Sequence, residues 1–151
     1  MALKENISRE PVTELTLRPL VLFEPDRPAR EACDAMQRER LGAAIAVDPV
    51  GRPMGMFNEK VLIRLLADSP DALDEPASKH MVREVVTVKQ TDPIAVLIAT
   101  MKQRHLRWVC VVDDEGKAIA LTGLRGVMEY VVDHHPLLVK STPIRRKLSM
   151  N

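Results

Sequence analysis

The fold of this chain is decided by two matching stretches, AAIAVDPVG at residues 43–51 and WVCVVDDEG at residues 108–116. Each begins with a continuous apolar run and ends in a turn that closes on glycine. A short apolar run of this kind is typical of a strand covered on both faces, and Asp, Pro and Gly favour the turn that follows. The two stretches therefore predict the same buried strand and the same turn, 65 residues apart.

The repeat extends far beyond these stretches. At the same offset of 65, residues 16–66 align with residues 81–131 without a gap, and apolar positions coincide nearly throughout. A whole chain segment that repeats its pattern once indicates two copies of one structural unit. The identical pairs are Arg18 and Arg83, Pro28 and Pro93, Met36 and Met101, Leu41 and Leu106, Val47 and Val112, Asp48 and Asp113, and Gly51 and Gly116.

Each copy predicts the element order β-α-β-β-α, which places the chain in the α+β class. Pro28 and Pro93 suit the first position of a helix, with Asp92 as the N-cap of the second one. The apolar residues that follow have the spacing of a one-sided helix. The expected first strands are 20–23 and 85–88, the expected second strands of each hairpin are 53–57 and 117–122, and the closing helices are 58–67 and 123–133.

These patterns divide the chain into five parts. Residues 1–15 form an N-terminal lead-in, 16–67 the first copy and 78–135 the second copy. Residues 68–77 between them are rich in acids and prolines, which predicts an exposed connector, and 77–81 suit one helical turn. The last part, 136–151, is a basic tail.

Composition excludes several classes of protein. With 46% hydrophobic and 28% charged residues the chain can bury a core, and no apolar run reaches the ~18 residues of a membrane span. Residues 1–10 carry charges of both signs, so no secretory signal is expected. Two cysteines without a Cys-x-x-Cys motif argue against a disulfide framework and a zinc site, and favour the cytoplasm.

The net charge of +1 and the 3% of aromatic residues argue against a nucleic-acid-binding protein. The charge is nevertheless uneven, because Lys140, Arg145, Arg146 and Lys147 give the tail four positive charges and no negative one. Such a tail is either a solvated terminus or a contact with an acidic partner or nucleic acid. The pair His134 and His135 has no further ligands in sequence reach, so no metal site is expected.

The duplicated pattern resembles the tandem CBS-domain pair, also called the Bateman module. In the first copy the resemblance rests on PDRPAREA at 25–32, Met36, AVD at 46–48, Gly51 and Gly55. In the second copy it rests on Met81, VTV at 86–88, TDP at 91–93, Met101, VVD at 111–113 and Gly116. It covers about residues 16–133 of the chain.

The resemblance implies two CBS motifs packed with pseudo-two-fold symmetry around two clefts, usually as a homodimer. Family members commonly bind AMP, ADP, ATP, NAD or S-adenosylmethionine in the clefts as regulatory ligands and then regulate a partner protein. In such members a (T/S)-x-x-D motif holds the ribose and the phosphate. Here its first position is Asn58 in one copy and Gly123 in the other, and Val61 and Gly126 replace the acid.

The resemblance places candidate ligand-binding residues at both clefts. Trp108 could stack on a base or simply be buried, and His105 and Arg107 could contact a phosphate or be surface charge. Asn58 is favoured as a helix cap. The candidates in the second cleft are Val86, Thr87, His105, Leu106, Arg107, Trp108, Val109, Gly123, Arg125 and Gly126. Those in the first cleft are Val21, Leu22, Gly42, Ala43, Ala44, Asn58 and Lys60.

Two functions follow from these observations. The leading hypothesis is a stand-alone regulatory module that binds an adenosyl-type nucleotide or related ligand in an inter-motif cleft and signals to a partner. The alternative is a protein-interaction or dimerisation module whose degenerate clefts bind no nucleotide. No catalytic set with interpretable spacing is present in the sequence, so an enzyme is not expected.

Overall fold

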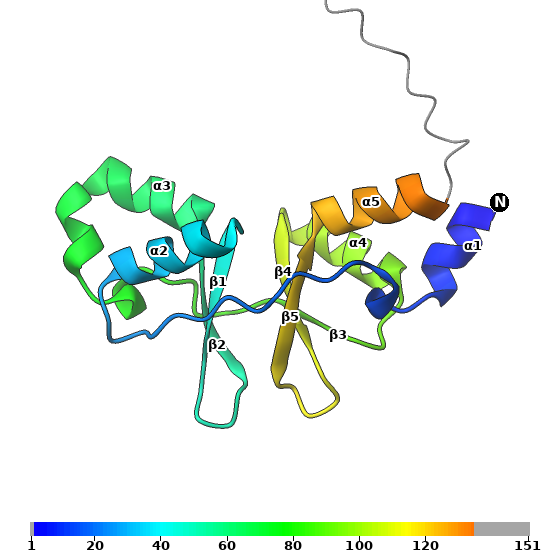
Figure 1. Ribbon diagram of the computed structural model, residues 1–151, viewed down its shortest axis with the longest axis horizontal. Helices are drawn as coiled ribbons and strands as arrows, with labels where there is room; N and C mark the ends of the chain where they lie inside the picture. Colours follow the sequence, from blue (N-terminus) through cyan, green and yellow to red (C-terminus); the bar gives the residue numbers. More distant parts are fainter. Residues whose placement is uncertain (1, 135–151) are drawn as a thin grey trace, which may run out of the picture.

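The computed structural model describes residues 2–134 and shows two similar units side by side (Figure 1). The predicted basic tail and His135 lie outside the described residues. The helices are α1 (Ala2–Arg9), α2 (Ala29–Glu39), α3 (Glu59–Asp68), α4 (Ile94–Arg104) and α5 (Leu124–His134), with 3-10 turns η1 (Val12–Glu14), η2 (Pro70–Asp74) and η3 (Ala77–Lys79). The strands are β1 (Ala43–Val47), β2 (Pro53–Asn58), β3 (Thr87–Lys89), β4 (Trp108–Val112) and β5 (Ala118–Gly123).

The sheets confirm the α+β prediction and the duplication. Strands β1 and β2 form an antiparallel hairpin, and β4 and β5 form the equivalent one, with β3 parallel to β4. Register repeats at the same offset, because Ala43 pairs with Asn58 and Trp108 pairs with Gly123. The predicted strand at residues 20–23 is reduced to one bridge from Leu22 to Ile45.

The two units exchange the segments that precede their hairpins, residues 10–18 and 78–82, which are called their lead-ins from here on. Arg18, which precedes the first unit, pairs with Leu121 of β5 through N···O distances of 2.8 and 3.0 Å. In the same way Val82, which precedes the second unit, pairs with Met56 of β2 at 2.8 Å in both directions. Figure 1 shows the N-terminal segment crossing in front of β5 on its way to α2. The outer strand of each hairpin, β2 or β5, therefore pairs with a segment from the other copy.

The starts of α2 and α4 correct the predicted capping. Both helices begin one residue later than expected, and Pro28 and Pro93 occupy the N-cap position. The backbone N–H of Ile94 donates to the carbonyl of Glu10 in the other lead-in, at 2.9 Å. Asp92 does not cap α4, because its carboxylate accepts from the Lys89 N–H at 2.8 Å and closes the preceding turn. The exchanged lead-ins thus take the place of side-chain caps.

The connector at residues 68–77 is exposed along most of its length, as predicted, but two of its alanines are buried. Its first part forms η2, which packs against α2 and α3. Ala72 is 6% exposed and Ala77 is fully buried, although the acids around them reach solvent. The connector therefore contributes Ala72 and Ala77 to the first core cluster as well as linking the two units.

The core consists of two clusters of buried apolar side chains. One is built on β1, β2 and α2 and extends to Cys110 and Leu121 of the second unit. The other is built on β4, β5, α4 and α5 and includes Val12 and Leu15 of the lead-in, with Leu3 and Ile7 of α1 packed against it. Both lead-in and core therefore tie the two copies into one folding unit, as expected for copies that are each small.

The buried Tyr130 of α5 connects this helix to the lead-in of the first unit through a hydrogen bond. The Tyr130 hydroxyl donates to the carboxylate of Glu10, and its ring stacks on His134 with centroids 4.3 Å apart. Burial, together with the bond to Glu10, raises the pKa of Tyr130 from 10 to about 12.

We expect this tyrosine to make stability fall at alkaline pH. A group whose folded pKa is raised contributes stability that is complete below its unfolded pKa and is lost as the pH rises through the folded value. The free energy of unfolding should therefore decline between pH 10 and pH 12. Urea unfolding across that range checks this, and Tyr130→Phe should flatten the decline. An equal decline in the variant would assign it to other groups.

Candidate functional site

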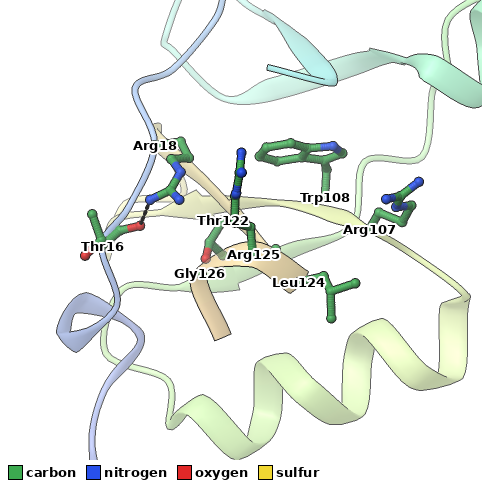
Figure 2. A pocket seen from close by; sticks show the side chains of 9 residues that line it. Thr16, Arg18, Arg107, Trp108, Thr122, Leu124, Arg125 and Gly126 are labelled. Carbon is green, nitrogen blue, oxygen red and sulfur yellow. Dashed lines mark hydrogen bonds between the residues drawn. The ribbon is translucent and has the colours of Figure 1, made fainter. Parts of the chain in front are cut away.

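A small pocket lies where the start of α5 meets the lead-in of the first unit (Figure 2). Its volume is about 20 Å³, enough for a group the size of one water molecule. Residues from three segments meet there: the lead-in, the start of β4 and the junction of β5 with α5. The lining residues are Thr16, Arg18, Arg107, Trp108, Thr122, Gly123, Leu124, Arg125 and Gly126.

Arg18 forms one wall of the pocket and is held by its neighbours. Its Nη2 atom lies 2.5 Å from the Glu129 carboxylate on α5, and its Nη1 donates to the Thr16 carbonyl at 2.8 Å. The side chain is 19% exposed. Because the Arg18 backbone also bridges to β5, the crossing of the lead-in fixes this guanidinium at the pocket.

The Thr122 hydroxyl is the buried polar group of the pocket. Thr122 is 1% exposed, and within residues 2–134 its Oγ1 has no hydrogen-bond partner. Gly126 keeps the space beside this oxygen open, since a Cβ on Gly126 would lie 3.2 Å from it. An unpaired buried hydroxyl costs roughly 1–3 kcal/mol. It therefore marks a place where a ligand group can gain a hydrogen bond.

The N-terminus of α5 faces the pocket, and no side chain of the preceding residue caps it. The residue before α5 is Gly123, and the first turn contains no acid. The equivalent helix α3 differs, because the Asn58 Oδ1 accepts from the Val61 N–H at 2.9 Å and Glu59 lies in its first turn. The predicted cap by Asn58 is confirmed. The positive end of α3 is thus satisfied internally, whereas that of α5 favours an external anion.

The counterpart of the pocket in the first copy is filled. The positions 65 residues before Thr122 and Gly126 carry Phe57 and Val61, which are fully buried and 3% exposed. Met81, the counterpart of Thr16, packs its sulfur against Gly55, where a Cβ would lie 2.3 Å from it. The two copies therefore differ at this position, and the second copy is the one with a polar opening.

A larger groove of about 700 Å³ adjoins the pocket and shares Arg107 and Trp108 with it. It lies between the start of α3 and the end of α4, so both copies line it. Basic side chains predominate and the only acid among the lining residues is Glu59. The lining residues are Gly42, Asn58, Glu59, Lys60, Ile63, Arg64, Arg104, His105, Leu106, Arg107 and Trp108.

The structure brings together about half of the predicted candidates. Arg107, Trp108, Gly123, Arg125 and Gly126 meet at the small pocket, and Gly42, Asn58, Lys60, His105 and Leu106 meet with them at the groove. The resemblance predicted two separate clefts, yet candidates from both copies line this one groove.

The remaining candidates line neither space. Ala43, Ala44 and Val109 are fully buried and Val21 is 3% exposed, so these side chains belong to the core. Leu22 lines a separate hollow with Phe23 and Asp48 near the end of β1. Thr87 is exposed on β3, and Val86 precedes it.

Sequence reasoning missed several lining residues. Thr16 and Arg18 were missed because the crossing of the lead-in cannot be read from one copy's pattern. Thr122 had a signal, since it is a polar residue near the end of an apolar strand. The others are Glu59, Ile63, Arg64, Arg104 and Leu124.

Residues 2–134 contain neither a metal-binding cluster nor a membrane-spanning helix. No group of three or more His, Cys, Asp or Glu side chains is arranged to hold a metal ion there. None of the helices in that range has the length and apolar character needed to cross a membrane.

Two intertwined units of the same element order, with a basic groove between them, define a tandem-repeat α+β module. The chain belongs to the CBS domain family, which it matches twice, at residues 12–68 and 77–133. The predicted resemblance to a CBS-domain pair is confirmed by these matches and by the solved structures below.

Three similar proteins illustrate the relationship. A 17.7 kDa protein of Acidianus ambivalens is 21% identical over 83% of this chain and 76% of its own length. A CBS domain protein from Pyrobaculum aerophilum, solved in complex with AMP, is 28% identical with a TM-score of 0.71 and covers 77% of this chain and 88% of its own. The CBS domain pair of protein MJ0100 was solved with 5′-methylthioadenosine and S-adenosyl-L-methionine. It is 17% identical with a TM-score of 0.73 and covers 82% of this chain and 97% of its own.

Proposed function

We propose that this protein is a regulatory CBS-pair module that binds an adenosyl-type nucleotide in the groove between its two copies. The observation that carries the proposal is the groove of about 700 Å³, lined by both copies and by the half-buried indole of Trp108. Its size falls in the range of small-molecule sites. An aromatic wall beside basic side chains suits a base at one end and phosphate at the other.

The similar protein from Pyrobaculum aerophilum supports a nucleotide ligand, because it was solved with AMP. The charges of the groove support the same class. Lys60, Arg64 and Arg107 have no ion-pair partner within residues 2–134, and Arg104 has only a 3.5 Å contact with the exposed Glu84. Glu59 is the single acid among the lining residues. We therefore expect AMP, ADP, ATP or NAD as the regulatory ligand.

Removing the indole tests this proposal. Trp108→Leu should weaken AMP binding by about tenfold, since a base–aromatic stack is worth about 1–3 kcal/mol, whereas Trp108→Phe should keep most of the affinity. Isothermal titration with AMP, ADP, ATP, NAD and S-adenosylmethionine measures this. Trp108 is the only tryptophan, so its fluorescence reports binding directly. Absence of binding by every ligand at millimolar concentration would overturn the proposal.

The function that we propose is regulation rather than catalysis. Cys110 is buried, and burial raises the pKa of its thiol to about 12, which leaves it protonated at neutral pH. A ligand that contacts both copies would favour one relative arrangement of them, and a partner protein would respond to that population shift.

Cys33 and Cys110 are both free thiols, and we therefore place the protein in the cytoplasm.

We also propose a homodimer that forms through an apolar helix face. This face comprises Leu124, Met128 and Val132, spaced four residues apart on α5, and Ile63 and Leu66 on α3. Ile63 and Met128 are equivalent in the repeat and are 66% and 58% exposed. A second copy is the fitting occupant, because a face that repeats on α3 and α5 is complementary to itself under two-fold symmetry.

Met128→Glu should convert the dimer to a monomer, because it places a charge in the centre of the apolar helix face. Sedimentation velocity at several protein concentrations measures the change. The matched control is Val50→Glu, since Val50 is 55% exposed but lies in the turn between β1 and β2, away from the helices. If Met128→Glu sediments as the unaltered protein does, this face is not the interface.

The alternative of an interaction module without a nucleotide also has an observation in its favour. The first-copy pocket is filled by Phe57, Val61 and Met81, and neither copy has an acid at the position of Val61 and Gly126. That module would form the same dimer, but its melting temperature would not respond to any nucleotide. A ligand that binds the folded state raises the melting temperature, so thermal shift separates the two functions.

A further inference from the structure

We infer that a hollow at the edge of the first unit is a docking surface, and that the chain's own C-terminal tail occupies it. This edge hollow has a volume of about 460 Å³ and lies beside the end of β1. It shares no lining residue with the small pocket or with the groove between the copies. Its apolar lining residues are Leu22, Phe23, Pro25, Val47 and Pro49.

Two large apolar side chains at the edge hollow are left in solvent. Leu22, which lines it, is 52% exposed. Val50, which follows Pro49 in the turn between β1 and β2, is 55% exposed. Neither belongs to the apolar helix face on α3 and α5, so the homodimer would not cover them. Apolar side chains exposed beside a hollow favour a segment that buries them on docking.

The backbone at the edge hollow also has unused hydrogen-bonding groups. Leu22 bridges to Ile45 of β1 through the carbonyl of Val21 and the N–H of Phe23. The N–H groups of Leu22 and Glu24 donate no hydrogen bond within residues 2–134. An open strand edge of this kind can pair with an extended peptide, whose side chains then enter the neighbouring hollow.

The charge of the edge hollow is negative. Its charged lining residues are Glu24 and Asp48, and neither forms an ion pair in the described part of the chain. The backbone N–H groups of Arg52 and Val50 donate to the Asp48 carboxylate at 2.9 Å each and lower its pKa, so it is ionised at neutral pH. The occupant should therefore be an extended segment that carries both apolar and basic side chains.

The C-terminal tail has this composition. Residues 136–151 contain four basic side chains and no acid, and IRRKL at 144–148 places three of the four between two apolar residues. The tail follows α5 in the second unit, on the other side of the molecule from the edge hollow (Figure 1). Residues 144–148 have an extended reach of roughly 35–45 Å from His134. This reach can cross a folded chain of this size, whose radius of gyration is about 14 Å.

The second copy has no equivalent surface. At the counterparts of Leu22 and Glu24 it carries Thr87 and Lys89, so a polar side chain replaces an apolar one and a base replaces an acid. The N–H of Lys89 is also occupied, since it donates to the Asp92 carboxylate at 2.8 Å. The basic tail therefore has one docking position for each chain.

Photo-crosslinking of the full chain tests the inference. With p-benzoylphenylalanine in place of Leu148, peptide mass spectrometry should find cross-links to residues 22–25 or 47–50 of the same chain. Leu22→Lys removes an apolar contact and repels the tail, so the yield should fall at least about fivefold. The matched control is Thr87→Lys at the equivalent position of the second copy, which should keep the yield of the unaltered chain. Leu22 and Thr87 are both exposed, so neither substitution threatens folding.

Charge reversal tests the ionic part of the contact. Glu24→Lys should lower the yield, and Arg145→Glu with Arg146→Glu in the same chain should restore most of it, because the two signs are then exchanged. A yield that stays low in the combined variant would contradict pairing between the tail and this acid.

Three other outcomes would overturn the inference. Cross-links to the acidic connector at 68–77 would show that charge alone attracts the tail. Cross-links that join two chains would place the tail on another copy. Equal yields from Leu22→Lys, Thr87→Lys and the unaltered chain would show that the edge hollow does not hold the tail.

Discussion

Phe57→Ala is expected to lower the free energy of unfolding by about 3–5 kcal/mol. Phe57 is fully buried in the first core cluster, and its ring meets that of Phe23 edge-to-face at a centroid distance of 6.2 Å. The substitution removes the apolar burial of the ring and leaves a cavity that the surrounding strands can fill only in part. Because the exchanged lead-ins join the two cores, we expect both copies to unfold together.

Urea unfolding followed by far-UV circular dichroism measures this loss. Phe57→Leu serves as the control and should cost clearly less, since it keeps most of the apolar volume. Thr122→Val, at the equivalent position of the second copy, serves as a comparison, because it replaces an unpaired buried hydroxyl with a methyl group of the same shape. One variant should be strongly destabilised and the other not. A loss below about 1 kcal/mol for Phe57→Ala would contradict the tight packing of this cluster.

Gly123→Ala is expected to cost at least about 2 kcal/mol through steric overlap with the backbone. A Cβ on Gly123 would lie 2.0 Å from the carbonyl oxygen of Arg107, which is a backbone atom immediately before β4. That carbonyl also accepts from the Leu124 N–H at 3.3 Å. Relief of the overlap would therefore move the start of α5 as well as β4, and AMP binding should weaken together with stability.

The matched control is Asn58→Ala at the equivalent position of the first copy. Asn58 already carries a side chain there, so the substitution loses only a helix cap, worth about 1 kcal/mol. Chemical denaturation should rank Gly123→Ala as the less stable of the two variants. If Gly123→Ala is as stable as the unaltered chain, β4 and α5 are less closely packed than the structure shows.

Much of the fold could be predicted because the sequence pattern of each strand, turn and helix occurs twice at the same spacing. The apolar runs at β1 and β4, the turns after them and the closing helices appear twice with the same offset, so each copy supports the other. Residues 20–23 were predicted as a strand on apolar character alone, but only Leu22 pairs. The capping prediction failed at Asp92 because the lead-in, which is remote in sequence, provides the bond to Ile94.

The site could be predicted only where one copy contributes adjacent residues. Trp108, Arg125 and Gly126 were found in this way, since the family motif places them beside the strand–helix junction. Arg18 and Thr16 were not found, because only the exchange of lead-ins carries them to that junction. The candidates Val21 and Val109 occupy the predicted strands but face the core, since alternate strand residues point to opposite faces.

The amino-acid pattern was sufficient for the duplication, the order of elements, the family and the loss of the usual acid at Val61 and Gly126. These features depend on periodicity and local propensity, which neighbouring residues carry. Folding in three dimensions settled which copy keeps an open polar pocket. In the second copy, Thr122 and Gly126 leave a space beside Thr16 and Arg18 of the lead-in. In the first copy, Phe57, Val61 and Met81 fill the equivalent space. Packing between segments that are distant in sequence has no local signature, so it had to be observed.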